Sequence, residues 1–448
     1  MSSRRSLVLL VCLALMGLFA PATTAQAAVP QKGTYHPLTA SRLLDTRTGV
    51  GATKQPLGAA KTLQLTVAGR GGVPSSGVSA VVLNLTVTGP TASSYLAVYP
   101  SGSTRPTVSA INFLKGWTRA NSATVPLGTG GKVTIYNSAG STAVIADVLG
   151  YYASDDSTSG GSEFTPPAAP DRLLDTRQTD EGALAAHTVI DSWVDFGTNG
   201  ELNASVKALA LNITVIHAGA SGFVTAWDGK GDVPVSSTLN FQDAGAVANL
   251  TVVKTTLCTE CSAPAPVQFS VYNGSSASVD VIVDLVGIYY NDGTVGLRFS
   301  PLTPQRITDS RKALNGKPLA AQETQLLTAP TAVANTATDM LVANVTAVSP
   351  TSNTYLTLWK SGDAKPTVSN LNARPGANIA NGALFEISGT RKFNIYNSTG
   401  TTNFLIDVTG RFVAGPTTTA AVAAAANRYS GVAVTPATST QQRRSTSR

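Results

Sequence analysis

Residues 81–88 read Val-Val-Leu-Asn-Leu-Thr-Val-Thr. Successive side chains of a strand point to opposite faces, so one face of this stretch carries Val81, Leu83, Leu85 and Val87. The other face carries Val82, Asn84, Thr86 and Thr88. β-Branched residues dominate the stretch, and it has no helical period. It therefore predicts a β-strand with at least one buried face.

This strand belongs to a set of motifs that occurs three times in one order. Each copy opens with a charged hexapeptide, Arg-Leu-Leu-Asp-Thr-Arg at 42–47 and 172–177 and Arg-Ile-Thr-Asp-Ser-Arg at 306–311. The landmarks that follow are Asn-x-Thr (Asn84, Asn212, Asn344), an aromatic strand (Tyr99, Trp227, Trp359), Ser-x-x-Asn (109–112, 237–240, 369–372), Ala-Asn (Asn121, Asn249, Asn381) and Tyr-Asn (Asn137, Asn273, Asn397). Each copy closes on an apolar strand with Asp147, Asp284 or Asp407 and a glycine three residues later. This order predicts three copies of one domain.

Each copy spans about 115–130 residues, which is a usual size for a domain with its own core. Within a copy, seven or eight short segments alternate with turn signals, and this pattern is typical of a sandwich. The sequence thus predicts an all-β protein of three tandem β-sandwich domains, Ig-like or jelly-roll-like. The expected bounds are 36–153, 164–290 and 299–413 for the repeats, 154–163 and 291–298 for linkers, and 414–448 for a disordered tail.

The N-terminus resembles a secretion signal. Arg4 and Arg5 precede an apolar run at 7–20, and Ala25-Gln26-Ala27 supplies the small residues of a cleavage site. We expect a signal peptide at 1–27. The alternative is an uncleaved membrane anchor. Such an anchor requires roughly 18–20 consecutive apolar residues, and the run at 7–20 is shorter. No later segment is long and apolar enough to span a membrane.

The formal net charge of +7 lies largely outside the repeats. Two arginines belong to the leader, and Arg428, Arg443, Arg444 and Arg448 lie in a tail without acidic residues. A nucleic-acid partner requires cations clustered on the folded surface. The sequence therefore argues against nucleic-acid binding.

The aspartate of each closing strand has apolar neighbours on both faces, which predicts a buried carboxylate. A buried carboxylate needs a cation or several hydrogen bonds. The only cations that recur as regularly are the two arginines of the hexapeptide. Our hypothesis is a structural ion pair in each copy: Arg42 or Arg47 with Asp147, Arg172 or Arg177 with Asp284, and Arg306 or Arg311 with Asp407. It would join the first element of each domain to its last strand.

A catalytic reading of the same carboxylates is the alternative. Asp45 and Asp147 would then form the acid–base pair of a glycosidase, although flanking arginines hold both carboxylates ionised. His36, His187 and His217 occupy unrelated positions in the copies. No repeated Ser-His-Asp or zinc site is therefore expected, and no phosphate loop is present. We expect no catalytic residue, no cofactor and no metal.

The repeated asparagines are interpreted as residues that satisfy backbone groups at turns. Glycosylation of the Asn-x-Thr sites and a cation site built from Asp and Asn oxygens are the alternatives. Cys258 and Cys261 occur in the second copy alone, where the first has a tight turn. They predict a small disulfide at a hairpin tip, with a redox-active pair as the alternative.

The motifs Arg-Leu-Leu-Asp-Thr-Arg, Asn-Leu-Thr-Val-Thr, Tyr-Leu-x-Val-Tyr-Pro, Ala-Asn, Tyr-Asn and Val-Leu-Gly-Tyr-Tyr together resemble a repeat of secreted and surface proteins from high-GC actinobacteria. The resemblance covers nearly the whole mature chain, and the third copy departs from it at 307–310. It implies a chain of such domains outside the cell, and it carries no defined activity.

The sequence thus predicts a secreted, non-catalytic binding or structural protein, either associated with the cell wall or released from the cell. Tyr99, Trp227 and Trp359 are candidate contacts for wall polysaccharide or another surface protein, and three weak sites would gain avidity. In the alternative interpretation these rings close the rim of each domain. The alternative functions are a carbohydrate hydrolase and a self-assembling surface-layer or adhesion component. The oligomeric state is left open.

Overall fold

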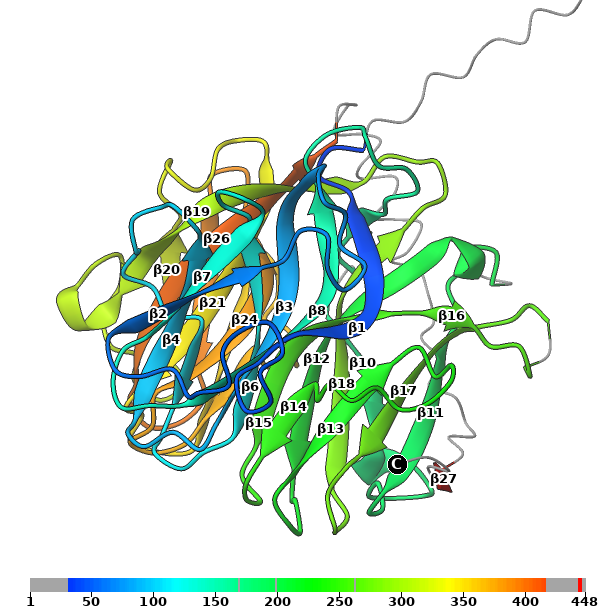
Figure 1. The fold of residues 1–448 in the computed structure, drawn as a ribbon, viewed down its shortest axis with the longest axis horizontal. Coiled ribbons are helices and arrows are strands. Elements are labelled where there is room, and N and C mark those ends of the chain that lie inside the picture. The colour runs from blue at the N-terminus through cyan, green and yellow to red at the C-terminus, as the bar shows by residue number, and fades with distance from the viewer. Residues whose placement is uncertain (1–30, 168–169, 198–199, 262, 416–441, 445–448) are drawn as a thin grey trace, which may run out of the picture. The chain divides into compact units, whose positions relative to one another are not determined.

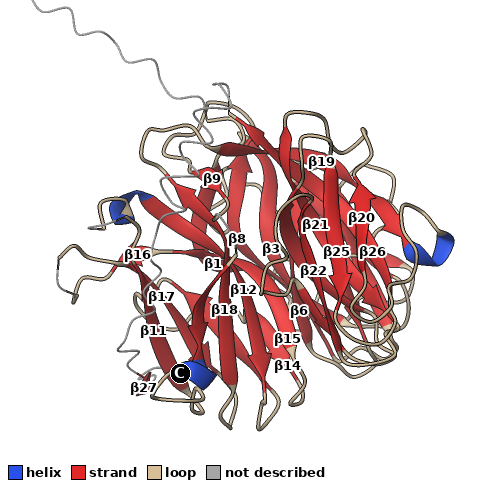
Figure 2. Ribbon diagram, turned by 180° about the vertical axis from the view of Figure 1, so that it is seen from behind, coloured by secondary structure: helices blue, strands red, loops and turns tan. Residues whose placement is uncertain are grey.

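The computed structural model describes residues 31–167, 170–197, 200–261, 263–415 and 442–444. The expected signal peptide at 1–27 lies outside this range. Strands make up nearly all the regular structure, and the helices are short 3-10 turns: η1 (Thr176–Gln178), η2 (Asn203–Ser205) and η3 (Ser310–Lys312) (Figure 2). In these ranges we find no helix with the length and apolar character needed to cross a bilayer.

Repeat 1 folds into two antiparallel sheets that face each other (Figure 1). Its strands are β1 (Tyr35–Asp45), β2 (Lys61–Thr66), β3 (Val78–Thr88), β4 (Ser94–Pro100), β5 (Ile111–Phe113), β6 (Arg119–Pro126), β7 (Lys132–Asn137) and β8 (Ala143–Ala153). One sheet has the order β1-β8-β3-β6, and the other has the order β2-β7-β4-β5. Two interleaved Greek keys of this order form a jelly roll.

Repeats 2 and 3 have the same strand order. Repeat 2 contains β9 (Glu163–Thr165), β10 (Asp171–Asp175), β11 (Thr188–Val194), β12 (Val206–Ile216), β13 (Gly222–Trp227), β14 (Leu239–Phe241), β15 (Val247–Lys254), β16 (Thr256–Leu257), β17 (Val267–Asn273) and β18 (Asp280–Tyr290). Repeat 3 contains β19 (Leu297–Asp309), β20 (Thr324–Thr328), β21 (Thr338–Val348), β22 (Thr354–Lys360), β23 (Leu371–Ala373), β24 (Ile379–Glu386), β25 (Lys392–Asn397) and β26 (Asn403–Ala414). The prediction of three β-sandwich domains is confirmed, and the strand order is that of the jelly roll.

The alternation in residues 81–88 reflects two separate cores. Val81, Leu83 and Leu85 fill the space between the two sheets of repeat 1. Val82 and Ala80, on the opposite face of β3, are equally buried but belong to a cluster that all three repeats share. Strand β3 is thus covered on both faces, which explains why both faces carry apolar residues.

The two expected linkers take part in the fold. Ser162 forms an isolated bridge with Tyr35, and β9 pairs with both β18 and β19. Strand β19 begins inside the expected linker at 291–298. The three repeats therefore form one compact unit rather than separate domains on spacers.

We expected the whole tail from residue 414 onward to be disordered, but two parts of it lie in strands. Ala414 is the last residue of β26, and Gln442–Arg444 form β27, which pairs antiparallel with β11. Residues 416–441 and 445–448 lie outside the described part of the chain.

Aromatic residues from all three repeats meet at one shared cluster. Its rings are Tyr35 and Tyr152 of repeat 1, Phe164 and Tyr289 of repeat 2, and Phe299 and Phe412 of repeat 3. The last-strand ring of each repeat lies on the first-strand ring of another, with centroid separations of 4.4 Å (Tyr289–Tyr35), 4.3 Å (Phe412–Phe164) and 4.1 Å (Tyr152–Phe299). These contacts form a closed cycle, so removing any one repeat would expose aromatic surface of the other two.

The glycine that follows each closing aspartate makes room for these rings. Gly150 lies against Tyr35, Gly287 against Phe164 and Gly410 against Phe299. A Cβ at any of the three positions would overlap the facing ring. The repeated glycine is therefore a packing requirement of the interface between repeats.

Candidate functional site

The first arginine of each hexapeptide lies on the buried aspartate of the closing strand. Arg42 in β1 is directly opposite Asp147 in β8. Its Nε donates to Oδ1 at 2.8 Å and its Nη2 to Oδ2 at 3.2 Å, and Asp147 is 0% exposed. The equivalent Nε–Oδ1 distances are 2.8 Å for Arg172–Asp284 and 2.7 Å for Arg306–Asp407. These three contacts have the geometry of the structural ion pairs hypothesised from the sequence. Their effect on stability stays a prediction.

The second arginine of the hexapeptide does not contact the closing aspartate. Arg47 instead donates to Asp45, two residues before it, with an Nη2–Oδ2 distance of 2.7 Å. Arg177–Asp175 and Arg311–Asp309 repeat this contact. The Arg47 guanidinium holds the pKa of Asp45 below its ordinary value. The local contact prevails because a two-residue separation on an exposed turn brings the guanidinium to the nearer carboxylate.

The pKa values of the closing aspartates shift in the opposite direction, because these carboxylates are buried. Burial raises the pKa of Asp147, and the hydrogen bonds from Arg42 offset part of this rise. The pKa values of Asp284 and Asp407 are raised for the same reason. Arg42 also reaches Asp45, at 3.4 Å. Both carboxylates of the catalytic alternative are thus engaged by arginine.

The asparagines of Asn-x-Thr and Ala-Asn join neighbouring repeats. Asn84 of repeat 1 donates through Nδ2 to the carbonyl of Ser237 in repeat 2, at 2.6 Å. Asn249 of repeat 2 donates to Oδ1 of Asn84 at 3.0 Å and accepts from the backbone N–H of Ser122 at 2.9 Å. Both asparagines are buried. One amide pair thereby satisfies backbone groups on both sides of the interface.

The same arrangement closes into a ring around the three repeats. Between repeats 2 and 3, Asn212 donates to the Ser369 carbonyl and accepts from Asn381. Between repeats 3 and 1, Asn344 donates to the Ser109 carbonyl and accepts from Asn121. Sequence reasoning placed such asparagines at turns and missed this role. The only signal was that both recur in every copy.

The Tyr-Asn asparagines act within a repeat, as the turn interpretation expects. Asn137 donates through Nδ2 to the carbonyls of Leu57 and Gly140, at 2.9 and 3.0 Å. It ties the loop before β2 to the turn after β7. Asn273 and Asn397 make the equivalent contacts in the other repeats.

The candidate ligand-contact aromatics are largely buried. Tyr99 and Trp227 are 6% and 5% exposed, so they close the rim and do not present a ring to a ligand. Trp359 is half-buried, and its Nε1 donates to the carbonyl of Asp363 at 3.0 Å. The expectation of three equivalent aromatic sites is therefore wrong for repeats 1 and 2. Tyr99 packs with Ala97 and Tyr136, and Trp227 lies beside residues 38–40 in the first strand of repeat 1.

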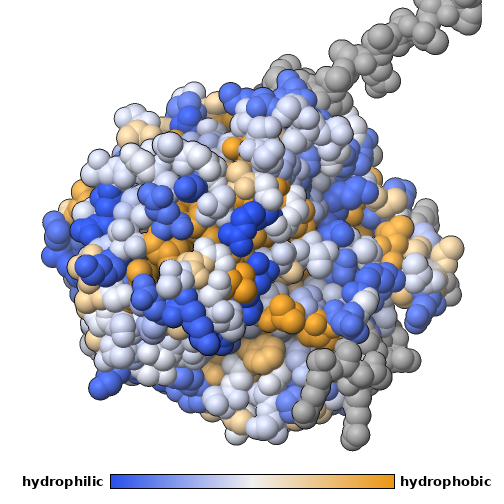
Figure 3. Space-filling view, viewed as in Figure 1, coloured by the Kyte–Doolittle hydropathy of each residue, from blue (hydrophilic) through white to orange (hydrophobic). Residues whose placement is uncertain are grey.

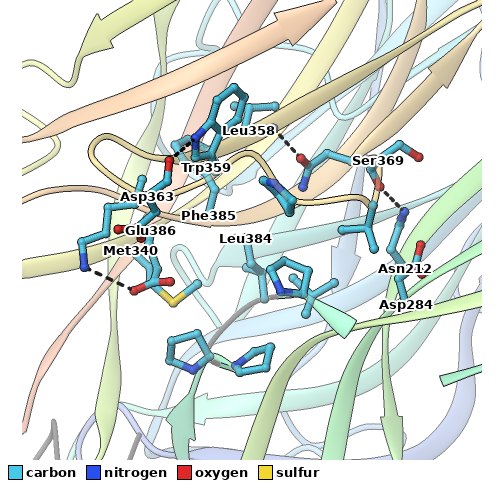
Figure 4. A pocket seen from close by; sticks show the side chains of 18 of the residues that line it. Asn212, Asp284, Met340, Leu358, Trp359, Asp363, Ser369, Leu384, Phe385 and Glu386 are labelled. Atoms are coloured by element: carbon cyan, nitrogen blue, oxygen red, sulfur yellow. Dashed lines mark hydrogen bonds and ion pairs between the residues drawn. The ribbon is translucent and has the colours of Figure 1, made fainter. Parts of the chain in front are cut away.

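Trp359 borders a cavity between repeats 2 and 3 of about 80 Å³ (Figure 4). Asn212 donates to the Ser369 carbonyl in its wall, and Lys360 lies 3.9 Å from Glu386. Polar groups that line this space thus have partners within the protein (Figure 4). It has room for a few water molecules only.

Two larger clefts open between repeats. The cleft between repeats 2 and 3 has a volume of about 740 Å³. Tyr355 lies on its wall beside amide and hydroxyl side chains, and the Arg374–Asp243 ion pair and small apolar residues complete the lining. The cleft between repeats 1 and 3 has a volume of about 410 Å³, and Arg105, Arg311 and Lys312 lie along it. Elsewhere, apolar side chains on the face shown in Figure 3 form small, separate patches among polar ones.

Cys258 and Cys261 are joined by a disulfide in the loop between β16 and β17. This loop is the extended hairpin that the sequence predicts there. No group of three or more His, Cys, Asp or Glu side chains suited to a metal ion is present in the described ranges.

No family model matches the chain, and no curated protein matches it. Two solved structures resemble it weakly. The first is described as the triple jelly roll fold and turret assembly of an archaeal virus, with 11% identity, 86% of this chain and 90% of that chain covered, and a TM-score of 0.17. The second is from Sulfolobus turreted icosahedral virus, with 10% identity, 88% and 98% covered, and a TM-score of 0.17. The fold assignment given above depends on the strand order alone.

Proposed function

We propose that this protein is a secreted, non-catalytic binding protein of the cell exterior that presents clefts between its three jelly rolls to a polysaccharide. The observation that carries the proposal is the ring of asparagine contacts. In this ring the repeated asparagines hold the three repeats together. The repeated charged side chains form the Arg–Asp pairs, which join the first and last strands within each repeat. An active site requires side chains left free to contact a substrate.

The cleft between repeats 2 and 3 supports polysaccharide as the ligand. Tyr355 is 36% exposed on its wall, next to the buried hydroxyl of Thr354 and to Asn372. A sugar presents an apolar ring face and several hydroxyls, which fit an exposed aromatic ring beside amides and hydroxyls. The leader expected at 1–27 and the resemblance to surface proteins support a place outside the cell, in contact with the wall.

Retention on insoluble polymers tests the proposal. The full chain is incubated with peptidoglycan, chitin and cellulose, and both bound protein and released soluble sugar are measured. We expect retention without released sugar, weakened in Tyr355→Ala and unchanged in Phe223→Ala, which removes the equivalent ring of repeat 2 outside the cleft. Released sugar would favour the hydrolase alternative. Light scattering that rises steeply with concentration, without retention, would favour self-assembly through strand edges.

A further inference from the structure

The cleft between repeats 1 and 3 differs from its counterparts in charge. Arg306 and Arg311 in its wall are already paired with Asp407 and Asp309. Arg105 and Lys312 have no carboxylate partner in the described residues, and both side chains are exposed. The Arg105 guanidinium is held over the Tyr136 ring, 3.9 Å from its centroid, so its position is fixed without a counter-charge.

The counterparts of these cations are missing in repeats 1 and 2, where they would line the corresponding interface. Val233 of repeat 2 stands at the position of Arg105, and Thr48 of repeat 1 stands at the position of Lys312. The interface between repeats 1 and 2 therefore lacks both charges. At the interface between repeats 2 and 3, Lys365 stands at the position of Arg105 and Gln178 at that of Lys312, so one of the two cations is kept. The pair of cations is specific to the cleft between repeats 1 and 3.

The wall of this cleft also contains buried polar atoms that have no hydrogen-bond partner in the part of the chain that the structure describes. They are Ser109 Oγ, Asn112 Oδ1 and Thr346 Oγ1. In repeat 2 the equivalent serine and asparagine bond to each other, Ser237 Oγ to Asn240 Oδ1 at 3.0 Å. In repeat 3, Asn372 Nδ2 donates to Ser369 Oγ at 3.3 Å. Repeat 1 does not make this contact, and neither atom has a hydrogen-bond partner among the described residues.

Buried polar atoms in proteins are normally hydrogen-bonded, and an unmade bond costs roughly 1–3 kcal/mol. A ligand with hydroxyl groups satisfies all three atoms, because a hydroxyl both donates and accepts. A carboxylate or phosphate on the same ligand neutralises Arg105 and Lys312 through charge-assisted hydrogen bonds. A neutral sugar would bond to the three buried atoms but would leave Arg105 and Lys312 without a counter-charge.

We infer that the cleft between repeats 1 and 3 binds an acidic sugar or polyol. Its hydroxyls bond to Ser109, Asn112 and Thr346, and its carboxylate or phosphate lies between Arg105 and Lys312. This inference deepens the proposed function and rests on it, since it names the acidic polymer that one of the clefts takes.

Calorimetric titration of the full chain with soluble polymers tests the charge requirement. Oligogalacturonate supplies carboxylates, poly(glycerol phosphate) supplies phosphodiesters, and cello-oligosaccharide is the neutral probe. The double variant Arg105→Gln/Lys312→Gln should bind the acidic probe about tenfold or more weakly. The control Lys365→Gln/Lys54→Gln removes the same charge elsewhere, including the Lys365 cation–π contact equivalent to that of Arg105, and should bind like the wild type. Equal loss in both doubles would overturn the inference, because it would show a general charge effect.

A single hydroxyl tests the buried wall. Thr346→Val removes an unpartnered Oγ1, so the thermal midpoint should stay the same or rise while binding of the acidic probe weakens about fivefold. Thr86→Val removes the equivalent unpartnered hydroxyl of repeat 1, which does not line the cleft, and should leave binding unchanged. Unchanged binding in Thr346→Val would contradict the assignment of this wall.

The outcomes separate the inference from the proposed function. If the variants keep full affinity for acidic probes while the wild type is retained on wall polymers, the cleft assignment is wrong and the proposed function stands. If no polymer, acidic or neutral, binds the wild type, both are wrong. Binding of only one acidic probe supports the inference and identifies the acid as carboxylate or phosphate.

Discussion

At the scale of single residues, the two arginines of each hexapeptide, five positions apart, have different partners. Arg42 has a side chain 20% exposed and holds Asp147, whereas the side chain of Arg47 is 48% exposed and holds Asp45; both carboxylates are buried. The contribution of an ion pair to stability depends on the surroundings of the charge that remains when the other partner is removed. Without Arg47, Asp45 would keep its contact with Arg42 at 3.4 Å, whereas without Arg42 the buried Asp147 would lose the guanidinium to which it is hydrogen-bonded.

The Arg42→Ala variant should therefore be less stable by about 3–5 kcal/mol, because it leaves Asp147 buried and unpaired. Arg47→Ala, the comparison variant, should cost less than Arg42→Ala, because the Arg47 side chain is half exposed and Asp45 keeps its contact with Arg42. Urea or thermal unfolding measures both. Equal midpoints for Arg42→Ala and the wild type would refute a structural role for this pair.

His36 gives the protein a defined response to pH. Burial against Tyr151 lowers its pKa from 6.5 to about 4, with the rings stacked at 4.6 Å. The unfolded chain binds a proton below pH 6.5 that the folded chain does not take up until about pH 4. The stability contributed by neutral His36 is thus present above pH 6.5 and is lost as pH falls through this window.

We expect His36→Phe, which keeps the stacked ring, to lose less stability than the wild type between about pH 7 and about pH 4.5. Thermal midpoints across this range provide the measurement. His187→Gln removes an exposed histidine and should follow the wild-type curve. Parallel curves for His36→Phe and the wild type would show that burial does not disfavour the imidazolium.

At the scale of elements, the first and last strands of each repeat form a unit. They pair along their length, carry the Arg–Asp pair in register and place one aromatic ring each in the shared cluster. A glycine on the last strand lets the ring of the first strand lie flat against it. Packing between repeats therefore depends on a glycine, which has no side chain, at this position of the last strand.

Gly150→Ala should destabilise the protein by about 1–3 kcal/mol, since the new Cβ overlaps the Tyr35 ring and overpacks the cluster. Gly389→Ala is the control, because a Cβ at Gly389 meets nothing within 4 Å. Chemical denaturation distinguishes them. A wild-type midpoint for Gly150→Ala would show that the ring can shift without loss.

At the scale of the whole molecule, the repeats depend on each other. Each sheet of the β1 type is covered on its outer face by the other two repeats, and edge strands β6, β15 and β24 contact one another. The asparagine ring closes the same interface with directional bonds. The described residues should therefore unfold as one cooperative unit and not as three.

Scanning calorimetry tests this cooperativity. The wild type should show a single transition. The triple variant Asn121→Ala/Asn249→Ala/Asn381→Ala leaves buried partners unsatisfied at all three interfaces, at about 1–3 kcal/mol each, and should melt lower with a broadened or split transition. Three resolved transitions in the wild type would contradict the single unit.

The sequence by itself determined the class of fold and the threefold repetition, and it narrowed the partners of the closing aspartates to two arginines each, because these follow from strand alternation and from the cost of burying a charge. The structure then selected the first arginine of each pair. Residues 81–88 and the recurring Arg and Asp positions carried that information. Only the tertiary structure decided that the repeats pack on one another, that Asn84 and Asn249 bridge them, and that Tyr99 and Trp227 are covered. Contacts between repeats join residues more than a hundred positions apart, and no local period or spacing encodes which face of one copy meets which face of the next.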